Sequence, residues 1–505
     1  LGEEPFAEAT AFLYSGSNPV QTGVQPGTIL PDRAAVIRGR VLDQAGQPLA
    51  GVIVSVLNHP AYGYTVSRSS GRFDLAVDGG GWLTLDYEKT GYLEAERAVR
   101  TPLQDYAIAP TVALVRPDSR RNPVVFGAGA PLEVAEGSWE SDASGRRRAT
   151  VIFPAGTEAT YVAPDGHSEL LSRGDVRITE VTVGALGPEA MPAALPATSA
   201  YTYAVDLALG PELVGGGKVE FNQPVDLYVN DFLKFPAGTV VPVGTYRFGR
   251  GQWVAGANGI VLKVLGVQGG EAQIALSGQD VAATPAELAQ YGFTGAELGA
   301  LAQRYRPGTL LWRVPLRHFS VYDTNWAAYV PTSAPPRKSV VPRPDCPRVR
   351  TGCEILTESQ ALVEQIPLAG TGLTLEYDSA RSTNRFSVDI PLTSSNPPSG
   401  ISAIRLKVAV EGQSFEQTFA PGPDQSHRYV WNGLDAYGRP VAGHVVAQVS
   451  VGYVFPDFYY EGTPFFGAYG TGTFVTGENQ RLGATVWRTY ALPLGARPSN
   501  PYAVK

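Results

Sequence analysis

The residue types that most often carry catalysis are thinly spread in this chain of 505 residues. Its histidines form neither an HExxH motif nor a pair at helical ligand spacing; they are His59, His167, His318, His427 and His444. No G-x-S-x-G elbow or phosphate-binding glycine loop occurs, and no cysteine has a histidine near it in sequence. We therefore predict that the chain is not an enzyme and that it binds no cofactor.

Cys346 and Cys353 are the two cysteines, and a segment with Pro and Arg separates them. This spacing fits a small disulfide loop in an exported protein, and it fits a pair of free thiols equally well. Two thiols without a nearby histidine make a poor zinc site. We predict no metal site and keep the pair as a disulfide candidate.

Three charged patterns are expected to lie on ordinary surface. Asp and Glu recur at alternating positions, which predicts solvated strand faces. Arg173-Gly174-Asp175 spells an integrin-type tripeptide, but a β-turn is the favoured interpretation. The run Arg146–Arg148 fits a protease site or a solvated turn, and we favour the turn.

The composition indicates a turn-rich, all-β protein with buried cores. Charged residues make up 17%, aromatic residues 10%, and the chain holds 57 Gly and 41 Pro, a balance unlike that of disordered chains. The net charge is −7 with no basic stripe, which disfavours nucleic-acid binding. No run of 18 apolar residues occurs, so no membrane span is predicted. The chain begins without Met, which is compatible with removal of a leader or upstream portion, and we expect a secreted or cell-surface protein.

The predicted fold is mainly β: a string of antiparallel β-sandwich domains with one short helical pair near residues 284–305. Alternating apolar residues bounded by Gly, Pro and Asn recur along the chain. Thr284 and Thr294 each precede a Glu at the third following position, which predicts two capped helices. The expected units are an extended arm (1–33), a β-sandwich (34–115), a β-rich domain with the helical insert (116–330), a Pro-rich linker (331–352), a further β domain (353–494) and a final segment (495–505).

The first sandwich resembles a known domain family. The pattern G-x-V-x-D-x-x-G-x-P-L-x-G-V-x-V-x-V from Gly39, then Ser70-Gly71-Arg72-Phe73-Asp74-Leu75 and Gly91-Tyr92, is similar to carboxypeptidase regulatory-like (transthyretin-like) domains over Ala35–Leu114. The resemblance implies a structural or adhesive module without catalysis.

Three later stretches resemble Rhs proteins and bacterial teneurin-like YD-repeat proteins. They are Cys353–Arg381, with Q-x-L-x-E-x-I-P-L-x-G-T and L-x-Y-x-S-x-R, then YVWNGLDAYGRPVAG (Tyr429–Gly443), then VGYVF (Val451–Phe455). The resemblance implies that residues 353–494 form a fibronectin-like plug that seals a β-cage, and that residues 495–505 lead into the YD shell. The cage, in the same polypeptide or as its cleaved remainder, is the expected partner, together with cell-surface or delivery-apparatus proteins. Relatives often carry an acidic calcium loop before the helices, but Gln279–Ala283 lacks it, so no calcium ligand is carried over there.

An aromatic stretch in the plug-like domain supplies the predicted partner interface. About half of its aromatic residues are expected to fill the core, and a Pro- and Gly-containing loop is expected to expose the rest. The interface candidates are Phe455, Phe458, Tyr459, Tyr460, Phe465, Phe466 and Tyr469.

Two alternatives stay open. A standalone secreted or cell-surface β-sandwich adhesin also fits the predicted units. A carbohydrate-binding accessory would stack sugars on exposed Trp82, Trp253, Trp312 or Trp326, although tryptophan in sandwiches is more often core.

Overall fold

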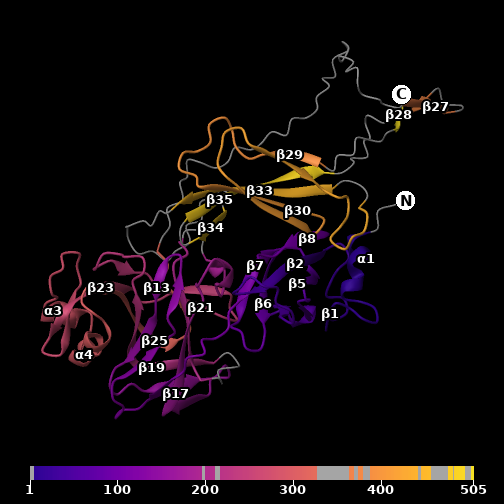
Figure 1. The fold of residues 1–505 in the computed structure, drawn as a ribbon. Coiled ribbons are helices and arrows are strands. Elements are labelled where there is room, and N and C mark those ends of the chain that lie inside the picture. Colours follow the sequence, from indigo (N-terminus) through magenta and orange to yellow (C-terminus); the bar gives the residue numbers. More distant parts are fainter. Residues whose placement is uncertain are drawn as a thin grey trace.

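The computed structural model describes residues 5–195, 199–210, 217–326, 363–368, 373–378, 387–441, 445–456, 476–480, 483–494 and 502–504. Within them, strands far outnumber helices and most sheets are antiparallel, which confirms the predicted fold class. Three sandwiches account for most of the described chain. Figure 1 shows the N-terminal sandwich (residues 5–115) beside the central sandwich (116–326), with the C-terminal sandwich (387–494) lying across the N-terminal one.

The N-terminal sandwich encloses one core between two sheets. Its first sheet has the order β1-β4-β3-β6-β7: β1 Gln21–Thr22, β4 Tyr64–Val66, β3 Ile53–Val56, β6 Trp82–Glu88 and β7 Ala95–Arg100. The second has β5 Arg72–Asp78, β2 Ala34–Asp43, β8 Asp105–Ile108 and β9 Val112–Leu114. Strand alternation turns Ile37, Phe73 and Leu85 inward. Pairing of β2 with β8 and β9 is parallel, because the chain crosses from the first sheet before it returns beside β2.

The first residues of this sandwich are more structured than the extended arm that the sequence predicted for residues 1–33. α1 (Phe6–Thr10) and η1 (Ala11–Leu13) place Leu13 against Val36 and Ala76, on the outer face of β2 and β5. Gln21 is buried, and its amide bonds to the backbone of Tyr62 and Ala76. Buried apolar contacts and hydrogen-bonded amides hold this segment in place. The sequence did not predict them because these residues do not recur at a regular spacing.

The central sandwich is built from two larger sheets. One has the order β10 Asn122–Val125, β17 Arg173–Glu180, β18 Ala204–Leu209, β26 Val321–Asp323, β21 Gly244–Arg247 and β22 Gln252–Ala255. The other has β11 Glu133–Glu136, β14 Ala149–Phe153, β19 Lys218–Asn230, β25 Leu310–Phe319, β23 Gly259–Gln268 and β20 Val240–Val241, joined by β15 Ala159–Val162, β16 Ser168–Leu171 and β24 Glu271–Ala275. α2 (Gly187–Ala190) lies beside β9.

The second central sheet is buried on both faces. Val151, Leu227 and Trp312 point to the core between the sheets, while their neighbours Ile152, Tyr228 and Leu311 point to a second core. α3 (Pro285–Gln290) and α4 (Gly295–Arg304) lie on that second side, as α4 packs on β24. Both helices begin with the capping box that the sequence predicted at Thr284 and Thr294. Two-sided burial explains the nearly continuous apolar runs of these strands.

Two charged motifs prove to be strands, contrary to the turns that the sequence predicted. Arg173–Asp175 opens β17 and pairs with β10. Arg147 ends β13 (Gly145–Arg147), which pairs with β12 (Glu140–Asp142), and its side chain is fully buried. The sequence shows charge, but it does not show the partner carboxylates that allow a charge to be buried.

The C-terminal sandwich encloses a core around Trp431, Leu406 and Val449. Its strands are β29 Ser387–Pro391 with β32 Ser426–Val430, facing the sheet β31 Gln413–Phe419, β30 Ala403–Val410, β33 Val445–Pro456, β35 Gly483–Leu494 and β34 Thr476–Gln480. A separate three-stranded sheet joins β27 Val363–Leu368, β28 Leu373–Asp378 and β36 Tyr502–Val504. Among the helices of the described residues, none has the length and apolar character needed to cross a lipid bilayer.

Candidate functional site at the domain junctions

The predicted aromatic interface is only partly within the described residues. Phe455 lies in β33 with 4% of its surface exposed and belongs to the C-terminal core, so it is not available as an interface residue. Its position in the alternation of β33 turns it inward with Tyr453. The other interface candidates, and both cysteines, lie outside the described residues; they are Phe458, Tyr459, Tyr460, Phe465, Phe466, Tyr469, Cys346 and Cys353.

The tryptophans considered for sugar stacking are mostly engaged within the protein. Trp312 is fully buried and Trp326 is 6% exposed. Trp253 donates its indole N–H to the carbonyl of Ala194. Trp82 is 70% exposed. A binding platform needs several exposed rings, and of these four tryptophans one is freely exposed.

A tight turn from the C-terminal sandwich, Leu434–Val441, makes the contact with the N-terminal sandwich. The Asp435 carboxylate accepts the backbone N–H of Tyr437 and of Arg439, each at 2.8 Å, and the Arg439 Nε–H at 2.7 Å. Gly438 sits at φ +81°, which favours glycine. The turn thereby projects Tyr437 and Arg439 away from their own sandwich.

Tyr437 and Arg439 reach the N-terminal sandwich through both rings and hydrogen bonds. The Tyr437 ring meets Phe12 edge-on at 5.0 Å between centroids, and its hydroxyl donates to Asp74 at 3.3 Å. Arg439 donates to the carbonyl of Ala9 at 2.6 Å. Burial, and then the charge of Asp74, raise the pKa of the Tyr437 phenol. The phenol therefore stays a neutral donor at physiological pH.

The β30–β31 hairpin closes the same junction from a second side. Arg38 donates to the carbonyl of Gly412 at 2.6 Å and also binds the buried Asp74 carboxylate, which Arg68 holds at 2.5 Å. A Cβ at Gly412 would lie 2.8 Å from the Tyr106 ring. The two sandwiches are thus close enough that only glycine fits at this point.

The N-terminal sandwich contains the same turn, at Leu42–Leu49. Asp43 accepts the backbone N–H of Ala45 and of Gln47, at 3.0 and 2.9 Å, and Gly46 sits at φ +78°. An isolated bridge closes each turn, Leu42 to Pro48 here and Leu434 to Pro440 there. The shared pattern L-D-x-x-G-x-P was visible in the sequence, and comparing the two motifs with each other would have found it.

The junction between the N-terminal and central sandwiches carries a cluster of carboxylates. Carboxylate oxygens of Asp86, Glu94 and Glu96 all lie within 4.8 Å of one another. Asp86 is 8% exposed and Glu96 is fully buried, so this alternation is not the solvated strand face that the sequence predicted. Burial, and then the charge of Glu94, raise the pKa of Asp86 to about 9.

Two side chains from β7 fasten this second junction. Glu96 accepts the hydroxyl of Tyr246 at 2.5 Å and the backbone N–H of Gly249 at 3.0 Å, both from the central sandwich. Arg97 is buried and donates to the carbonyls of Glu189 and Met191 at 2.7 and 2.8 Å. Glu96 and Arg97 are both fixed by β7, and their partners in the central sandwich are backbone groups together with the Tyr246 hydroxyl.

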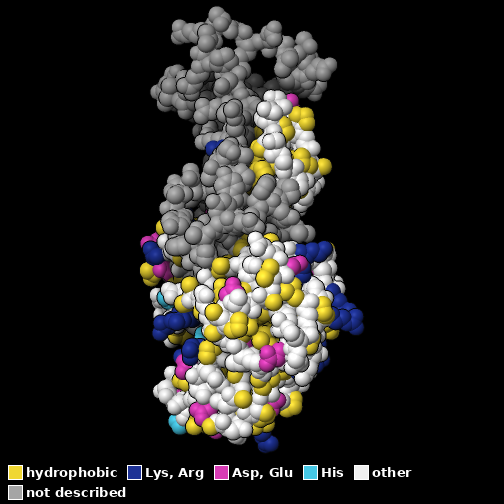
Figure 2. Space-filling model, turned by 90° about the vertical axis from the view of Figure 1, so that its left-hand side faces the viewer, with side chains coloured by type: hydrophobic (Ala, Val, Ile, Leu, Met, Phe, Trp, Pro, Cys, Tyr) yellow, Lys and Arg dark blue, Asp and Glu magenta, His cyan; other side chains and the backbone are white. Residues whose placement is uncertain are grey.

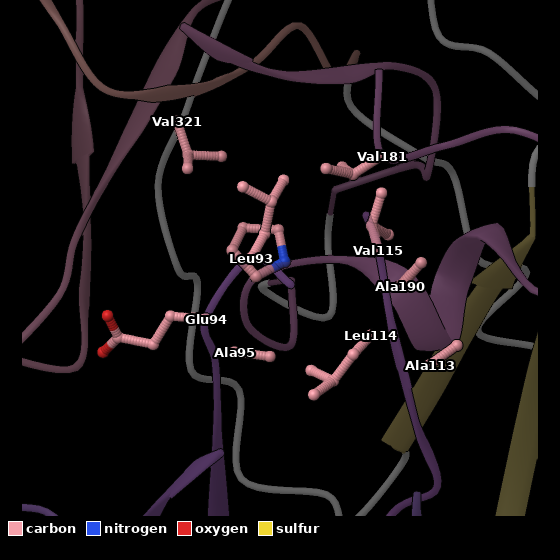
Figure 3. Close-up of a pocket in the computed structure, with 10 residues that line it drawn as sticks. Leu93, Glu94, Ala95, Ala113, Leu114, Val115, Val181, Ala190 and Val321 are labelled. Carbon is pink, nitrogen blue, oxygen red and sulfur yellow. The ribbon is translucent and has the colours of Figure 1, made fainter. Parts of the chain in front are cut away.

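A small apolar cavity of about 10 Å³ lies beside these residues, between the two sandwiches. Figure 3 shows Leu93, Ala113 and Val115 of one sandwich facing Val181 and Ala190 of the other, with the Glu94 carboxylate directed away from them. A volume of this size holds about one water molecule. It is far below the several hundred Å³ of a small-molecule site.

On the face drawn in Figure 2, apolar side chains lie scattered among charged and polar ones. The interactions at the described junctions are those that join domains. They are buried ion pairs, edge-on contacts between aromatic rings, and turns closed by a side-chain carboxylate.

Comparison with known proteins bears on both terminal sandwiches. The model of the teneurin TTR-like domain matches residues 30–114, and the model of the teneurin 1-4 FN-plug domain matches residues 388–459. Two of the domains are thus similar to teneurin domains. Neither match indicates a catalytic family, and each matched region contains one of the two turns with the L-D-x-x-G-x-P pattern.

The matching relatives are far longer than this chain. Teneurin-m of Drosophila melanogaster is 38% identical over 104 residues, and Teneurin-4 of Mus musculus is 42% identical over 100 residues. Each match covers 20% of this chain and 4% of the relative. Among solved structures, a DUF3823 family protein from Parabacteroides merdae aligns with 39% of this chain and 89% of its own at 12% identity and a TM-score of 0.12.

Proposed function

We propose that this chain is the non-catalytic N-terminal part of an Rhs/teneurin-like YD-repeat protein. In this proposal the FN-plug domain closes one end of a β-cage that encloses a C-terminal toxin or other cargo. The TTR-like domain and the central sandwich stay outside the cage, where they serve delivery or adhesion. The protein acts outside the cell or at its surface.

The observation that carries the proposal is the strand pairing on both sides of the plug. β28 precedes the FN-plug domain and β36 follows it, yet Leu375 pairs with Val504 and Tyr377 with Tyr502. The chain therefore leaves and returns at one small sheet that is separate from the plug sandwich (Figure 1). Within the described residues, β27 and β36 have no strand on their outer sides. Free edges of this kind accept further strands, as a cage wall would supply.

The junction with the TTR-like domain supports an outward position for that domain. The turn at Asp435 and the hairpin at Gly412 lie at the end of the plug where the TTR-like domain docks. That end is then covered, so the cage has to meet other faces of the plug.

A standalone secreted or cell-surface adhesin is the second candidate. The specific observation in its favour is that Glu96, Arg97 and Tyr437 join the three sandwiches through buried or part-buried contacts. Three sandwiches joined in this way suit a surface-binding protein without any cage.

The intact mass of the native protein, with peptide coverage beyond Lys505, separates the two candidates. A much larger mass, or a YD-repeat fragment that stays bound during purification, is the result expected for the capped cage. A native mass near 53.7 kDa without such a partner would leave the adhesin as the function.

A further inference from the structure

Four carboxylates share one sheet face where the TTR-like domain meets the central sandwich. Asp86 of β6 lies directly opposite Glu96 of β7. Alternation along β6 turns Glu88 to the same side as Asp86, and Glu94, which directly precedes β7, lies within reach of both Asp86 and Glu96. Like charges opposite each other destabilise a sheet, so this face requires a counter-charge.

The described part of the chain does not provide that counter-charge. No described Lys or Arg forms an ion pair with Asp86, Glu94 or Glu96, and the groups that act on Asp86 are themselves acidic. Arg97 follows Glu96 directly but turns to backbone carbonyls of the loop at 189–192.

Asp86 supplies an independent sign of a bound ligand. Its side chain is more than nine-tenths buried, and its Oδ1 atom has no hydrogen-bond partner. A buried carboxylate oxygen without a partner is costly. Asp86 supplies one of the carboxylate oxygens that lie within 4.8 Å of one another, so this buried side chain points into the cluster.

We propose that Asp86, Glu94 and Glu96 bind one Ca²⁺ ion. The donors are all hard carboxylate oxygens, with neither the imidazole nor the thiolate that zinc prefers. Ca²⁺ bonds oxygen at 2.3–2.6 Å, so ligands across the ion stand up to about 5 Å apart, and it accepts irregular geometry that Mg²⁺ does not. The site is separate from residues 279–283.

The site is positioned to lock the two domains together. Glu96 is held in place by Tyr246 and Gly249 of the central sandwich, yet each of its oxygens has a lone pair left for a metal. Glu94 is exposed, which gives the ion a path from solvent. An ion bound here bridges the TTR-like sheet and, through Glu96, the β21–β22 hairpin.

The test is calorimetric titration of the full chain, stripped with a chelator, with CaCl2. We expect one ion per chain with a dissociation constant on the order of 10⁻⁴ M, as in extracellular calcium modules. Terbium luminescence, sensitised by Tyr246, reports the same site directly. Glu94→Gln, an exposed substitution that leaves the fold intact, should weaken Ca²⁺ binding at least about tenfold, and Asp86→Asn should abolish it. Glu169→Gln, an exposed strand carboxylate in β16, is the matched control and should bind like the wild type.

The proposal would be overturned if the titration released no heat of Ca²⁺ binding and terbium gave no luminescence. Protons shared between the carboxylates would then relieve their mutual repulsion. Equal binding by wild type, Glu94→Gln and Glu169→Gln would overturn it as well, since the ion would then sit elsewhere. Tighter binding of Mg²⁺ than of Ca²⁺ would contradict the assignment of the ion.

Discussion

Arg147 is a single buried side chain that binds two carboxylates within the central sandwich. It is fully buried, donates to both oxygens of Asp142 and to Glu180, and stacks over Phe232 at 4.4 Å. Burial alone would raise the pKa of Asp142, but hydrogen bonds from Arg147 and from two backbone amides bring that pKa below its ordinary value. One guanidinium thus binds two carboxylates, the buried Glu180 and the half-buried Asp142.

Replacing Arg147 by Met should therefore destabilise the central sandwich by about 3–5 kcal/mol, because the buried Glu180 and the half-buried Asp142 lose the guanidinium that they share. Urea unfolding followed by tryptophan fluorescence measures this loss. The neighbouring Arg146 lies exposed over Trp139, so Arg146→Met should change the free energy of unfolding by no more than about 0.5 kcal/mol. Similar losses for both variants would refute the burial argument.

Asp323 should make the stability of the central sandwich depend on pH. It is fully buried between β18 and β21, and burial raises its pKa to about 7 from 3.8. The folded protein keeps a proton that the unfolded chain has released, so the free energy of unfolding falls as the pH rises from about 4 to about 7.

Asp323→Asn cannot titrate, and its amide oxygen can still accept from Asn325. The loss of stability between acidic and alkaline pH, measured by urea unfolding, should shrink by about 1–3 kcal/mol relative to the wild type. Asp165→Asn, in an exposed hairpin loop, should retain the wild-type pH profile. An unchanged profile for Asp323→Asn would show that this carboxyl is ionised in the folded state.

The repeated turn is the clearest feature at the scale of elements. Asp43 and Asp435 make the same two backbone hydrogen bonds, but position 437 is a tyrosine that reaches the TTR-like domain, and position 45 is an alanine. The same type of turn therefore only reverses the chain in the N-terminal sandwich, whereas in the C-terminal sandwich it also contacts a second domain.

Asp435→Ala should cost about 1–3 kcal/mol, because two backbone amides and Arg439 lose a common acceptor. It should also speed hydrogen exchange in α1, which Arg439 contacts at Ala9. Asp43→Ala is the matched control: its own turn should loosen while exchange in α1 stays unchanged. Faster exchange in α1 of both variants would mean that the turn does not act through Arg439.

The sequence predicted elements with local signals and missed those whose role is set by distant residues. Thr294 and Glu297 form the predicted capping box, but Glu297 also lies buried against Arg313, 2.8 Å from its Nε, and accepts from Tyr228. A cap is encoded within four residues, whereas those partners come from β19 and β25. The same holds for Phe455 and for Asp86, where composition pointed to a surface and the sheet placed the side chain inside.

At the scale of the whole molecule, the described chain is held together by two junctions rather than by linkers. The TTR-like domain contacts the central sandwich on one side through Glu96 and Arg97, and the plug on another through Arg38 and Asp74. Its docking to the plug depends on close backbone approach at Gly412.

Gly412→Val should separate the plug from the TTR-like domain, because a side chain there meets Tyr106. We expect a larger radius of gyration in small-angle scattering, and hydrogen exchange about tenfold faster in β8, which corresponds to roughly 1.4 kcal/mol. Gly400→Val controls for backbone strain: Gly400 also has a positive φ, but nothing lies within 4 Å of its Cβ position. If Gly400→Val expands the molecule as much, strain rather than domain contact is responsible.

The distance along the chain between Arg38 and Gly412, 374 residues, has a consequence for biosynthesis. Ribosomes add about 5–20 residues per second, so the TTR-like domain waits roughly 20–80 seconds before its docking partner exists. During that interval the aromatic side chains around Tyr106 that later meet Tyr437 face solvent. At this stage the nascent chain exposes an aromatic surface to which a chaperone can bind. Docking of the plug then covers that surface.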